Sequence, residues 1–481
     1  MLCKIIIRDE VNCKLEGLDA DTRRRLVAKF KYEVPYARHL PSVRLGRWDG
    51  KVAYFQLGGS TYINLLPDII EYLTERNWEF EIEDNRSSRQ SFQFNEVDEN
   101  TFAHKTWPKG HPVAGQPIVL RDYQIEIINK FLGNTQCVQN VATGAGKTIM
   151  TAALSLMVEP YGRSIVIVPS KSLVLQTEED YKNLGLDVGV YFGERKELGR
   201  THTICTWQSL NSLYKSTKGT GNEWTMMLNV AAVIVDEVHQ AKAEVLKSML
   251  TTEFADVPIR WGLTGTIPKE AFEQVALKVA IGDVISQLSA STLQEAGVLS
   301  NCHVNIVQTV EHSDFRNYQE ELKYLTTNKD RLDHMASFLS EVIKTGNTLV
   351  LVDRRECGDE LVARLPNSVF VQGDMKNAKR KEHYDEIANV SDKIIVATYG
   401  VAAVGINVPR IFNLVLIEPG KSFVRVIQSI GRGIRKAEDK DFVQIWDLTA
   451  DCKFAKRHLT KRKQFYKEAN YPFTQEKSIY K

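Results

Sequence analysis

The sequence predicts an α/β protein in which two tandem parallel-sheet lobes follow a small α+β domain. Three observations support this prediction. Strand-sized apolar runs alternate with helical patterns in two separate regions of the chain. A polar stretch from Asn100 to Pro117, broken by prolines and glycines, separates these regions from what precedes them. A chain of 481 residues can also bury two or three cores, because one core rarely serves more than about 250 residues.

The first 95 residues combine short strand-like runs with one helical pattern, which predicts the small α+β domain. The strand-like runs are Lys4 to Ile7 and Lys51 to Phe55, and the helical pattern extends from Pro67 to Asn77. We expect this domain to form a unit of its own. Residues 96–117 are expected to be a linker without regular structure.

Charge within the leading domain is uneven. Nine Lys and Arg side chains stand between Arg23 and Lys51 against only two acids, and aromatic residues are interleaved with them. This pattern is typical of a nucleic-acid contact, so the stretch is a candidate accessory site. Its candidate contact residues are Arg44, Arg47 and Lys51.

Residues 118–285 and 346–470 each contain apolar strand-like runs separated by helical patterns, which indicates a parallel sheet covered by helices on both faces. Residues 286–345 are expected to form a helical connection ending at Gly346, and residues 471–481 a C-terminal tail. The predicted strands are Cys137–Val141, Ile165–Val168, Thr203–Cys205, Val233–Val235 and Trp261–Leu263 in the first lobe, and Thr348–Val352, Val369–Val371, Ile394–Ala397, Leu414–Ile417 and Phe442–Trp446 in the second.

Composition argues against several classes of protein. The longest apolar runs are strand-sized and fall short of the roughly 20 residues that a membrane crossing needs. Seven cysteines are spread along the chain without a Cys-x-x-Cys pair, so neither a disulfide framework nor a metal cluster is indicated, and a cytoplasmic location is the simpler interpretation. The formal net charge of +2 identifies no binding partner by itself.

The segment Val141 to Thr148, with the sequence Val-Ala-Thr-Gly-Ala-Gly-Lys-Thr, follows a predicted strand and opens a predicted helix. In this context backbone N–H groups and a helix N-terminus bind phosphate oxygens. Lys147 would neutralise the β- and γ-phosphates, and Thr148 would bind Mg²⁺. The pattern departs from its usual form at Val141. The expected phosphate-contacting residues are Thr143, Gly144, Ala145, Gly146, Lys147 and Thr148.

A second motif, Asp-Glu-Val-His, follows the apolar run Ala232 to Val235 and places Asp236 and Glu237 at the carboxyl end of a predicted strand. Parallel sheets bind ligands at this edge. Asp236 can hold the metal ion and Glu237 can polarise an attacking water. By itself an acidic turn after a strand is common, but next to a phosphate loop it indicates nucleotide hydrolysis.

A third motif, from Gln428 to Arg435, lies in the second predicted lobe. Arg432 and Arg435 are three residues apart and could share one helix face. Arginines from a second lobe can stabilise the charge that develops on a γ-phosphate. A solvated basic helix is the alternative interpretation.

The order of these motifs resembles that of the superfamily 2 helicases, whose motor consists of two RecA-like lobes. The resemblance implies an ATP-dependent and Mg²⁺-dependent motor acting on nucleic acid. The fourth residue of the acidic motif is His239, and in this respect the motif resembles that of the DExH branch of the superfamily. Further matching segments are Leu120–Gln124, Val168–Gln176, Cys205–Leu210, Leu263–Thr266, Thr398 and Gly405–Pro409.

This resemblance implies roles for residues whose chemistry alone does not define them. Arg121 and Gln124 would contact the adenine, and Gly405 and Asn407 would link ATP to the strand. His239, Thr264 and Thr266 would couple the ATP site to movement. The strand itself would be held by Ser170, Thr206 and Thr398, mainly through phosphates, because a motor must step without reading sequence.

The segment Pro41 to Lys51, with its Trp-Asp-Gly turn, resembles the leading domain of UvsW-like phage helicases. Members of that family act on branched DNA, so the resemblance implies a DNA helicase or translocase that remodels forks, junctions and R-loops in replication, recombination or repair. Two alternatives remain: the motor subunit of a restriction system, and an ATP-switched nucleic-acid sensor that does not unwind. The first 100 residues contain no Glu-x-Lys that could complete a typical nuclease site.

A basic run near the C-terminus has two interpretations, a solvated helix face or a contact with duplex DNA. It contains no acid. Its members are Lys453, Lys456, Arg457, Lys461, Arg462, Lys463 and Lys467.

Overall fold

The structure is a computed structural model that describes residues 1–87, 90–108, 114–218, 225–242, 244–373, 375, 377–387, 390–403, 408, 410–437 and 439–480. The chain divides into two compact units, Met1–Asn140 with Gly146–Gln287 and Val141–Ala145 with Leu288–Lys481. In the described part of the chain, no helix has the length and apolar character that a membrane crossing requires.

The leading domain is built on a four-stranded sheet of order β5-β2-β1-β6, where β1 pairs antiparallel with β2 and parallel with β6. The buried Cys3, Ile5, Cys13 and Leu15 alternate along β1 and β2 and face helices α1 and α3. The elements are β1 (Leu2–Ile7), β2 (Asn12–Glu16), α1 (Ala20–Lys29), β3 (Lys31–Glu33), α2 (Pro41–Arg44), β4 (Lys51–Ala53), β5 (Ser60–Tyr62), α3 (Leu66–Thr74) and β6 (Glu79–Asp84).

This domain is not the separate unit that the sequence pattern predicts, because it shares a core with the first lobe. Ala276 and Val279 of helix α9 (Ala271–Ala280) complete the core of the leading domain, and Phe272 packs with Val34 and Ala37. Backbone bonds reinforce the contact, as in the bond from the amide of Glu10 to the carbonyl of Ala255. The composition of residues 1–95 gives no sign of this, since the contact forms between residues far apart in sequence.

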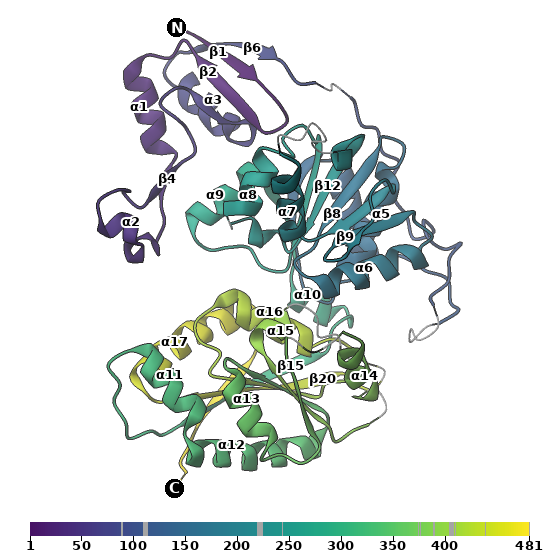
Figure 1. Ribbon diagram of the computed structural model, residues 1–481, viewed down its shortest axis with the longest axis vertical. Helices are drawn as coiled ribbons and strands as arrows, with labels where there is room; N and C mark the ends of the chain where they lie inside the picture. Colours follow the sequence, from purple (N-terminus) through teal and green to yellow (C-terminus); the bar gives the residue numbers. More distant parts are fainter. Residues whose placement is uncertain are drawn as a thin grey trace. The chain divides into compact units, whose positions relative to one another are not determined.

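The first lobe contains an eight-stranded sheet of order β10-β9-β11-β8-β12-β13-β7-β14, in which helices lie on both faces (Figure 1). Its central strands are buried throughout, which explains why they have no alternating pattern. The remaining elements are α4 (Asp122–Leu132), β7 (Gln136–Val141), α5 (Lys147–Val158), β8 (Arg163–Ile167), α6 (Lys171–Asn183), β9 (Val188–Phe192), β10 (Arg195–Lys196), β11 (His202–Cys205), α7 (Trp207–Thr217), β12 (Val230–Asp236), α8 (Glu244–Thr251), β13 (Ile259–Thr264) and β14 (Asp283–Leu288).

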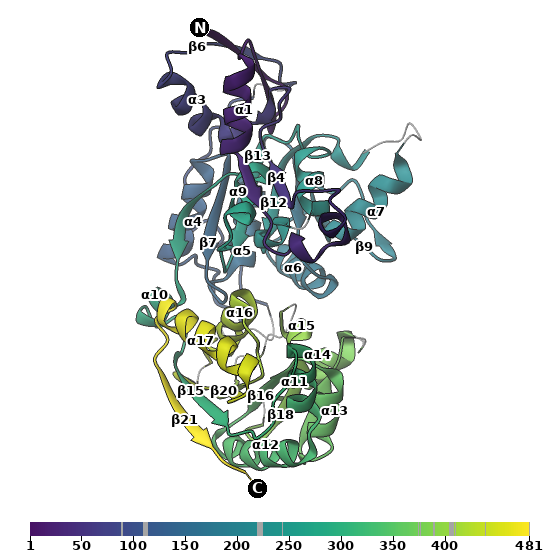
Figure 2. The ribbon, with the colours of Figure 1, turned by 90° about the vertical axis from the view of Figure 1, so that its left-hand side faces the viewer.

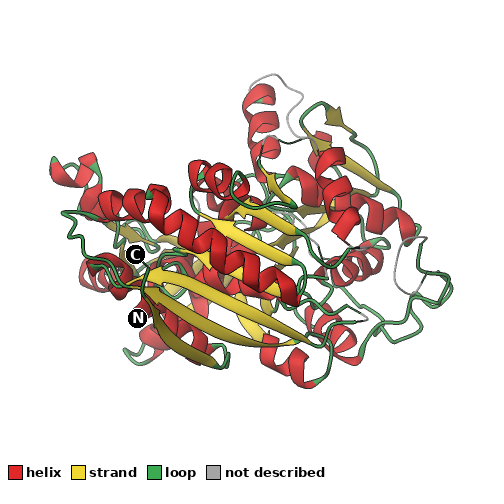
Figure 3. Cartoon of the chain, turned by 90° about the horizontal axis from the view of Figure 1, so that it is seen from below, coloured by secondary structure: helices red, strands yellow, loops and turns green. Residues whose placement is uncertain are grey.

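The second lobe contains a seven-stranded sheet of order β17-β18-β16-β19-β20-β15-β21, shown from two sides in Figures 2 and 3. Its elements are α10 (Ala290–Glu295), β15 (Asn301–Thr309), α11 (Tyr318–Thr327), α12 (Lys329–Val342), β16 (Thr348–Val352), α13 (Arg355–Val362), β17 (Ser368–Val371), α14 (Asn377–Ile387), β18 (Ile394–Thr398), α15 (Tyr399–Ala403), β19 (Asn413–Ile417), α16 (Phe423–Gly433), β20 (Phe442–Ala450), α17 (Lys453–Glu468) and β21 (Phe473–Ser478).

Two predicted boundaries of this lobe differ from the structure. The helical connection 286–345 contains β15, which lies between β20 and β21 in the sheet, and the C-terminal tail 471–481 contains the edge strand β21. Asn, His and Gln interrupt the apolar residues of β15, and Phe473 is the one apolar residue of β21, so neither segment has the apolar pattern of a buried strand.

Alternate residues of the second sheet face opposite helix layers. Val415 belongs to the core beneath α12 and α13, whereas Leu414 lies close to Gly433 of α16 on the other face. Asp447 of β20 is fully buried and accepts two bonds from the guanidinium of Arg462 on α17. Arg462 therefore anchors α17 to the sheet and is no part of an exposed basic face.

Candidate functional site: phosphate loop, acidic motif and strand-contacting segments

The phosphate loop connects β7 to α5, as the sequence predicts. The chain leaves β7 at Val141, and α5 begins at Lys147. Gly144 and Gly146 have φ values of 91° and 83°, which side-chain-bearing residues rarely adopt. A Cβ atom at Gly146 would also lie 2.6 Å from Nε2 of Gln124. The positive φ therefore favours glycine at 146, and a larger residue there would have to displace the amide end of the Gln124 side chain.

Gln124 lies at the start of α4 and is buried. Its Oε1 accepts a bond from the backbone N–H of Arg121 at 3.0 Å, completing a capping box at the helix N-terminus. The exposed Arg121 donates to the hydroxyl of Tyr123. The structure therefore brings Gln124 next to the phosphate loop, where the resemblance expects a base-contacting residue.

Lys147 and the two acids of the second motif form a buried cluster. Nζ of Lys147 donates to Oε1 of Glu237 at 2.8 Å and lies 4.0 Å from Oδ1 of Asp236. Burial raises the pKa of Asp236 above its ordinary value, and the Lys147 ammonium only partly opposes that effect. Burial acts in the same sense on Glu237, but Lys147 and His239 lower its pKa below the ordinary value. Glu237 is therefore the ionised partner of the lysine.

A chain of polar contacts connects Glu237 to Thr264 and Thr266, at the end of β13. Oε2 of Glu237 lies 3.3 Å from Nδ1 of His239, and the same nitrogen lies 2.9 Å from the hydroxyl of Thr264. The Thr264 hydroxyl also donates to the carbonyl of Thr266 at 2.9 Å. Glu237 adopts a φ of 51°, a strained conformation that aims its carboxylate along this chain. The buried hydroxyl of Thr266 has no hydrogen-bond partner among the described residues.

The donors near the loop fit a magnesium ion. Mg²⁺ is usually bound by one or two protein oxygens, with phosphates and waters completing its shell. Asp236 supplies a carboxylate, and Thr148, in the first turn of α5, supplies a hydroxyl. The described residues contain no group of three or more His, Cys, Asp or Glu side chains that could hold a metal without such additional ligands.

Ser170 and Thr206 follow the neighbouring parallel strands β8 and β11 and so lie at one edge of the first sheet. Both are helix N-caps: the Ser170 hydroxyl accepts from the amide of Leu173, and the Thr206 hydroxyl accepts from the amide of Ser209. Thr206 is 4% exposed. Its hydroxyl is committed to the cap of α7. Ser170 is half-buried.

Trp207, the residue after Thr206, packs against the core of the first lobe. This placement agrees with a packing role, the interpretation that its position after a buried strand favours.

In the second unit, Thr398 ends β18, and its hydroxyl accepts from the amide of Val401. Gln428 is buried on α16. Helix α16 ends at Gly433, so Arg435 lies beyond it, in a β-bridge with Leu299, and does not share a helix face with Arg432. Glycines at 431 and 433 weaken the helix there. Gly405, Asn407 and the side chain of Arg432 lie outside the described residues.

Lys440 has no signal in the sequence, because it stands among acids in the segment Glu438-Asp439-Lys440-Asp441. In the structure it is buried, and its Nζ donates to the carbonyls of Gly433 and Arg435 at 2.7 and 2.6 Å. Burial lowers the pKa of Lys440 to about 7, and Arg435 adds to the effect. Lys440 therefore fixes the backbone at the end of the third motif.

Apolar packing holds the basic loop of the leading domain, Arg44 to Lys51, in place. Trp48 packs with Val34, Ala37 and Phe272, and its indole N–H donates to the carbonyl of Lys51. Trp48 is thus a structural residue of the turn. The charged side chains are exposed: Arg44, Arg47 and Lys51.

Comparisons with known proteins agree with this arrangement. The family described as "Type III restriction enzyme, res subunit" matches residues 117–269, and the family described as "Helicase conserved C-terminal domain" matches residues 330–437. The ATP-dependent DNA helicase uvsW of Enterobacteria phage T4 is 23% identical over 464 residues, covering 92% of this chain and 89% of the phage protein.

Two further comparisons match part of the chain. The DNA 3'-5' translocase XPB2 of Sulfurisphaera tokodaii is 28% identical over 199 residues, covering 41% of each chain. The ATP-dependent Type ISP restriction-modification enzyme LlaBIII, in a structure bound to DNA, has a TM-score of 0.56 and 14% identity over 86% of this chain and 36% of its own. This last likeness concerns the fold alone.

The fold and the site define a nucleic-acid-dependent ATPase with two RecA-like lobes. The chain belongs to the superfamily 2 helicases of the DExH type, and it resembles the phage helicase uvsW along most of its length. It is an ATP-using DNA helicase.

Proposed function

We propose that this helicase remodels branched DNA, such as forks, junctions and R-loops, in replication, recombination or repair. One observation carries the proposal: the exposed basic loop Arg44 to Lys51 is packed against helix α9, so that the leading domain and the first lobe form one compact unit. A motor that only follows a single strand has no use for a second basic surface fixed to its ATP-binding lobe. A branch offers two arms, one for the motor and one for that surface.

In the proposed cycle, Lys147 and the N-terminus of α5 bind the phosphates of ATP, and Glu237 accepts a proton from the attacking water. Asp236 and Thr148 would hold Mg²⁺, which would supply charge neutralisation at the phosphates. Arg432 and Arg435 would stabilise charge on the γ-phosphate. The contacts from Glu237 through His239 and Thr264 give the coupling segment a direct connection to this chemistry.

Stimulation of ATP hydrolysis by different nucleic acids tests the proposal. Single strands, linear duplex, forks, four-way junctions and duplex RNA of equal length are compared at equal nucleotide concentration. We expect forks or junctions to give the lowest half-saturating concentration. The triple charge-neutral variant Arg44→Gln, Arg47→Gln, Lys51→Gln should lose that preference while keeping stimulation by single strands. Equal stimulation by all DNAs, or stimulation by RNA alone, would contradict the proposal.

A restriction motor is the second candidate, favoured by the match of residues 117–269 to a restriction-enzyme subunit family. That match covers the ATP-binding lobe, which both kinds of protein need. Incubation with ATP, Mg²⁺ and long duplex DNA separates them: a restriction motor would cleave or support cleavage at distance, and a branch remodeller would leave linear duplex intact. An ATP-switched sensor would displace no labelled strand from a fork.

A further inference from the structure

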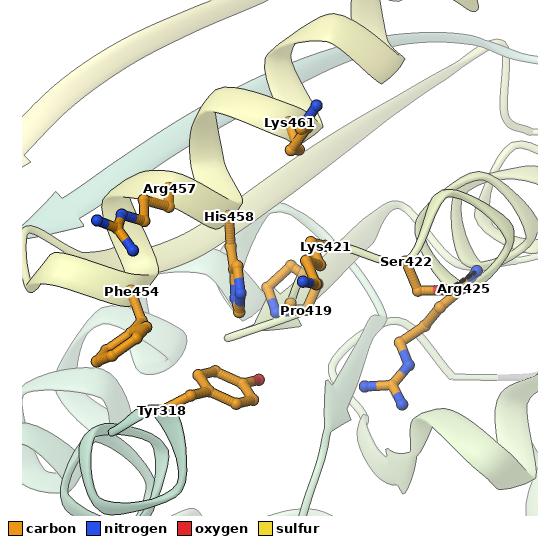
Figure 4. Close-up of a pocket in the computed structure, with 10 residues that line it drawn as sticks. Tyr318, Pro419, Lys421, Ser422, Arg425, Phe454, Arg457, His458 and Lys461 are labelled. Atoms are coloured by element: carbon orange, nitrogen blue, oxygen red, sulfur yellow. Dashed lines mark hydrogen bonds between the residues drawn. The ribbon is translucent and has the colours of Figure 1, made fainter. Parts of the chain in front are cut away.

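A basic pocket of about 570 Å³ lies in the second lobe between α11, α17 and the loop that joins β19 to α16 (Figure 4). Its aromatic side chains are Tyr318, Phe454 and His458, and its cations are Lys421, Arg425, Arg457 and Lys461. None of the ten lining residues is acidic. The pocket belongs entirely to the second unit.

The aromatic wall is a defined surface. The rings of Tyr318 and His458 meet edge to face with centroids 4.7 Å apart, and the ring of Phe454, one turn before His458 on α17, lies 6.4 Å from that of Tyr318 (Figure 4). Burial lowers the pKa of His458 to about 4, and the neighbouring cations Lys421 and Arg462 add to the effect. The histidine is therefore a neutral ring at physiological pH, and it can serve as a stacking surface.

Three of the cationic side chains that line the pocket could contact an anion. Lys421, Arg457 and Lys461 are exposed, and within the described ranges no ion pair involves them. Arg457 and Lys461 are one turn apart on α17, an arrangement of like charges that weakens a helix. Lys453 and Lys456 occupy its first turns, where the helix dipole disfavours cations. Stability therefore does not explain this placement, whereas a bound polyanion does.

Buried polar contacts hold the loop that lines the pocket. The carbonyl of Gly420 accepts a bond from the buried Arg462 at 2.8 Å, and Glu418 ahead of it is buried and paired with Arg331. Gly420 has a φ of 73°, which suits glycine. Lys421 thus directly follows a residue whose carbonyl is bonded to the buried Arg462.

The position of the pocket connects it to the strand-contacting segment. Strands β18, β16 and β19 are parallel neighbours, so Thr398 at the end of β18 and Pro419 after β19 lie at the same edge of the sheet. Arg425, which lines the pocket, contacts residues that follow β16 and β18. It pairs with Asp353, which follows β16, and its guanidinium lies 5.2 Å from the ring of Tyr399, the residue after Thr398.

We propose that this pocket binds an unpaired nucleotide of a DNA strand, with its phosphate held by Lys421, Arg457 and Lys461 and its base stacked on Tyr318 and His458. The inference rests on the proposed function, and it extends that function by a single-strand contact outside the motifs. Cationic grooves with aromatic side chains are the usual means of holding single strands, because every base has a π-face. Duplex DNA does not offer its base faces to such a wall.

The test compares two double variants of α17. Arg457→Gln with Lys461→Gln removes two charges from the pocket. Lys456→Gln with Lys467→Gln removes two exposed charges from the same helix outside the pocket. A labelled fork with an oligo-dT arm serves as probe. The pocket variant should bind it roughly 10-fold more weakly, and the slope of log K against log salt should fall in magnitude by about 1.4, about 0.7 for each contact with a single strand. The control variant should bind the fork with nearly the wild-type affinity and salt slope. Any change in either quantity should be less than half of the change in the pocket variant.

Base stacking and the identity of the ligand have separate readouts. Tyr318→Leu keeps apolar packing but removes the ring, so it should abolish the preference for a thymine arm over an abasic arm. Binding of a fluorescent ATP analogue is measured in a Lys147→Ala background, with and without the pocket substitutions. If the analogue still binds to Lys147→Ala and this binding disappears when the pocket substitutions are added, the ligand is a free nucleotide and the assignment is wrong.

The outcomes also separate this inference from the proposed function. If the two double variants bind the fork equally, the pocket assignment fails even when the wild type prefers forks. If the wild type shows no preference for branched DNA, the proposed function fails. The pocket assignment is then tested by comparing how the two double variants bind a single oligo-dT strand.

Discussion

Nζ of Lys147 donates to Oε1 of Glu237 at 2.8 Å, and the other oxygen of that carboxylate lies 3.3 Å from Nδ1 of His239. One carboxylate thus contacts both the phosphate loop and the start of the coupling chain. ATP binding would compete for Lys147, since the ammonium would turn from Glu237 to the phosphates. We propose that the loss of this contact changes the hydrogen bonds of His239 and Thr264.

Replacing Glu237 with Gln should separate nucleotide binding from hydrolysis. The amide keeps the shape of the side chain but cannot accept the proton of the attacking water. ATP turnover should fall by about 100-fold or more, with nucleotide affinity kept. Glu126→Gln, an exposed change on α4, is the matched control. Turnover near the wild-type rate in Glu237→Gln would remove Glu237 from the chemistry.

Thr264→Val tests the coupling chain. Valine has nearly the same shape as threonine but loses the hydroxyl that contacts His239 and Thr266. DNA-stimulated ATP turnover should persist, while the number of base pairs displaced per ATP should fall by about tenfold, in the range of ordinary coupling energies. The exposed Thr252→Val serves as control. Equal loss of both activities would show that Thr264 acts on hydrolysis itself.

Phe272→Ala tests the attachment of the leading domain. The buried ring packs against Val34 and Ala37, so its removal should cost about 3 kcal/mol of docking free energy. Limited proteolysis should then release a fragment close to residue 90, and the fork preference should weaken. Phe442→Ala, at a 45% exposed side chain, should leave the digestion pattern unchanged. An unchanged pattern in Phe272→Ala would contradict the shared core.

Lys440 predicts a pH dependence of stability. Its folded-state pKa of about 7 lies below the ordinary 10.5, so between these values the unfolded chain binds more protons than the folded one. The contribution of this group therefore rises as pH increases from 7 toward 10.5 and is lost as pH falls through 7. Lys440→Gln retains donors for the two carbonyls and should show a smaller gain in Tm between pH 7 and pH 9. If Tm rises equally with pH in the wild type and in Lys440→Gln, the lowered pKa of Lys440 is contradicted.

The sequence alone was enough to predict the two lobes, and contiguous motifs also predicted which residues lie around the loop between β7 and α5. Asp236 ends β12 and Glu237 follows it, whereas Lys147 follows the loop after β7, and the carboxyl ends of parallel strands meet at one edge of the sheet. The predicted contacts around them therefore depend on topology that the alternation of strands and helices already implies.

Long-range packing could not be predicted in this way. The shared core of the leading domain depends on Phe272 and Ala276, ordinary residues of an amphipathic helix. The basic run near the C-terminus contains Arg462, which is fully buried against Asp447, beside Arg457 and Lys461, which line a pocket. Charge along the sequence does not distinguish these cases, because only the fold decides which side chains meet an acid.

Lys147→Ala gives the most direct test of the central claim, that ATP bound at this loop drives a motor on DNA. Turnover of ATP is measured with and without a fork, alongside displacement of a labelled strand, and circular dichroism checks that the variant is folded. We expect a folded protein that shows neither fork-stimulated ATP turnover nor displacement of the labelled strand. Fork-stimulated ATP hydrolysis retained by the folded variant would contradict it.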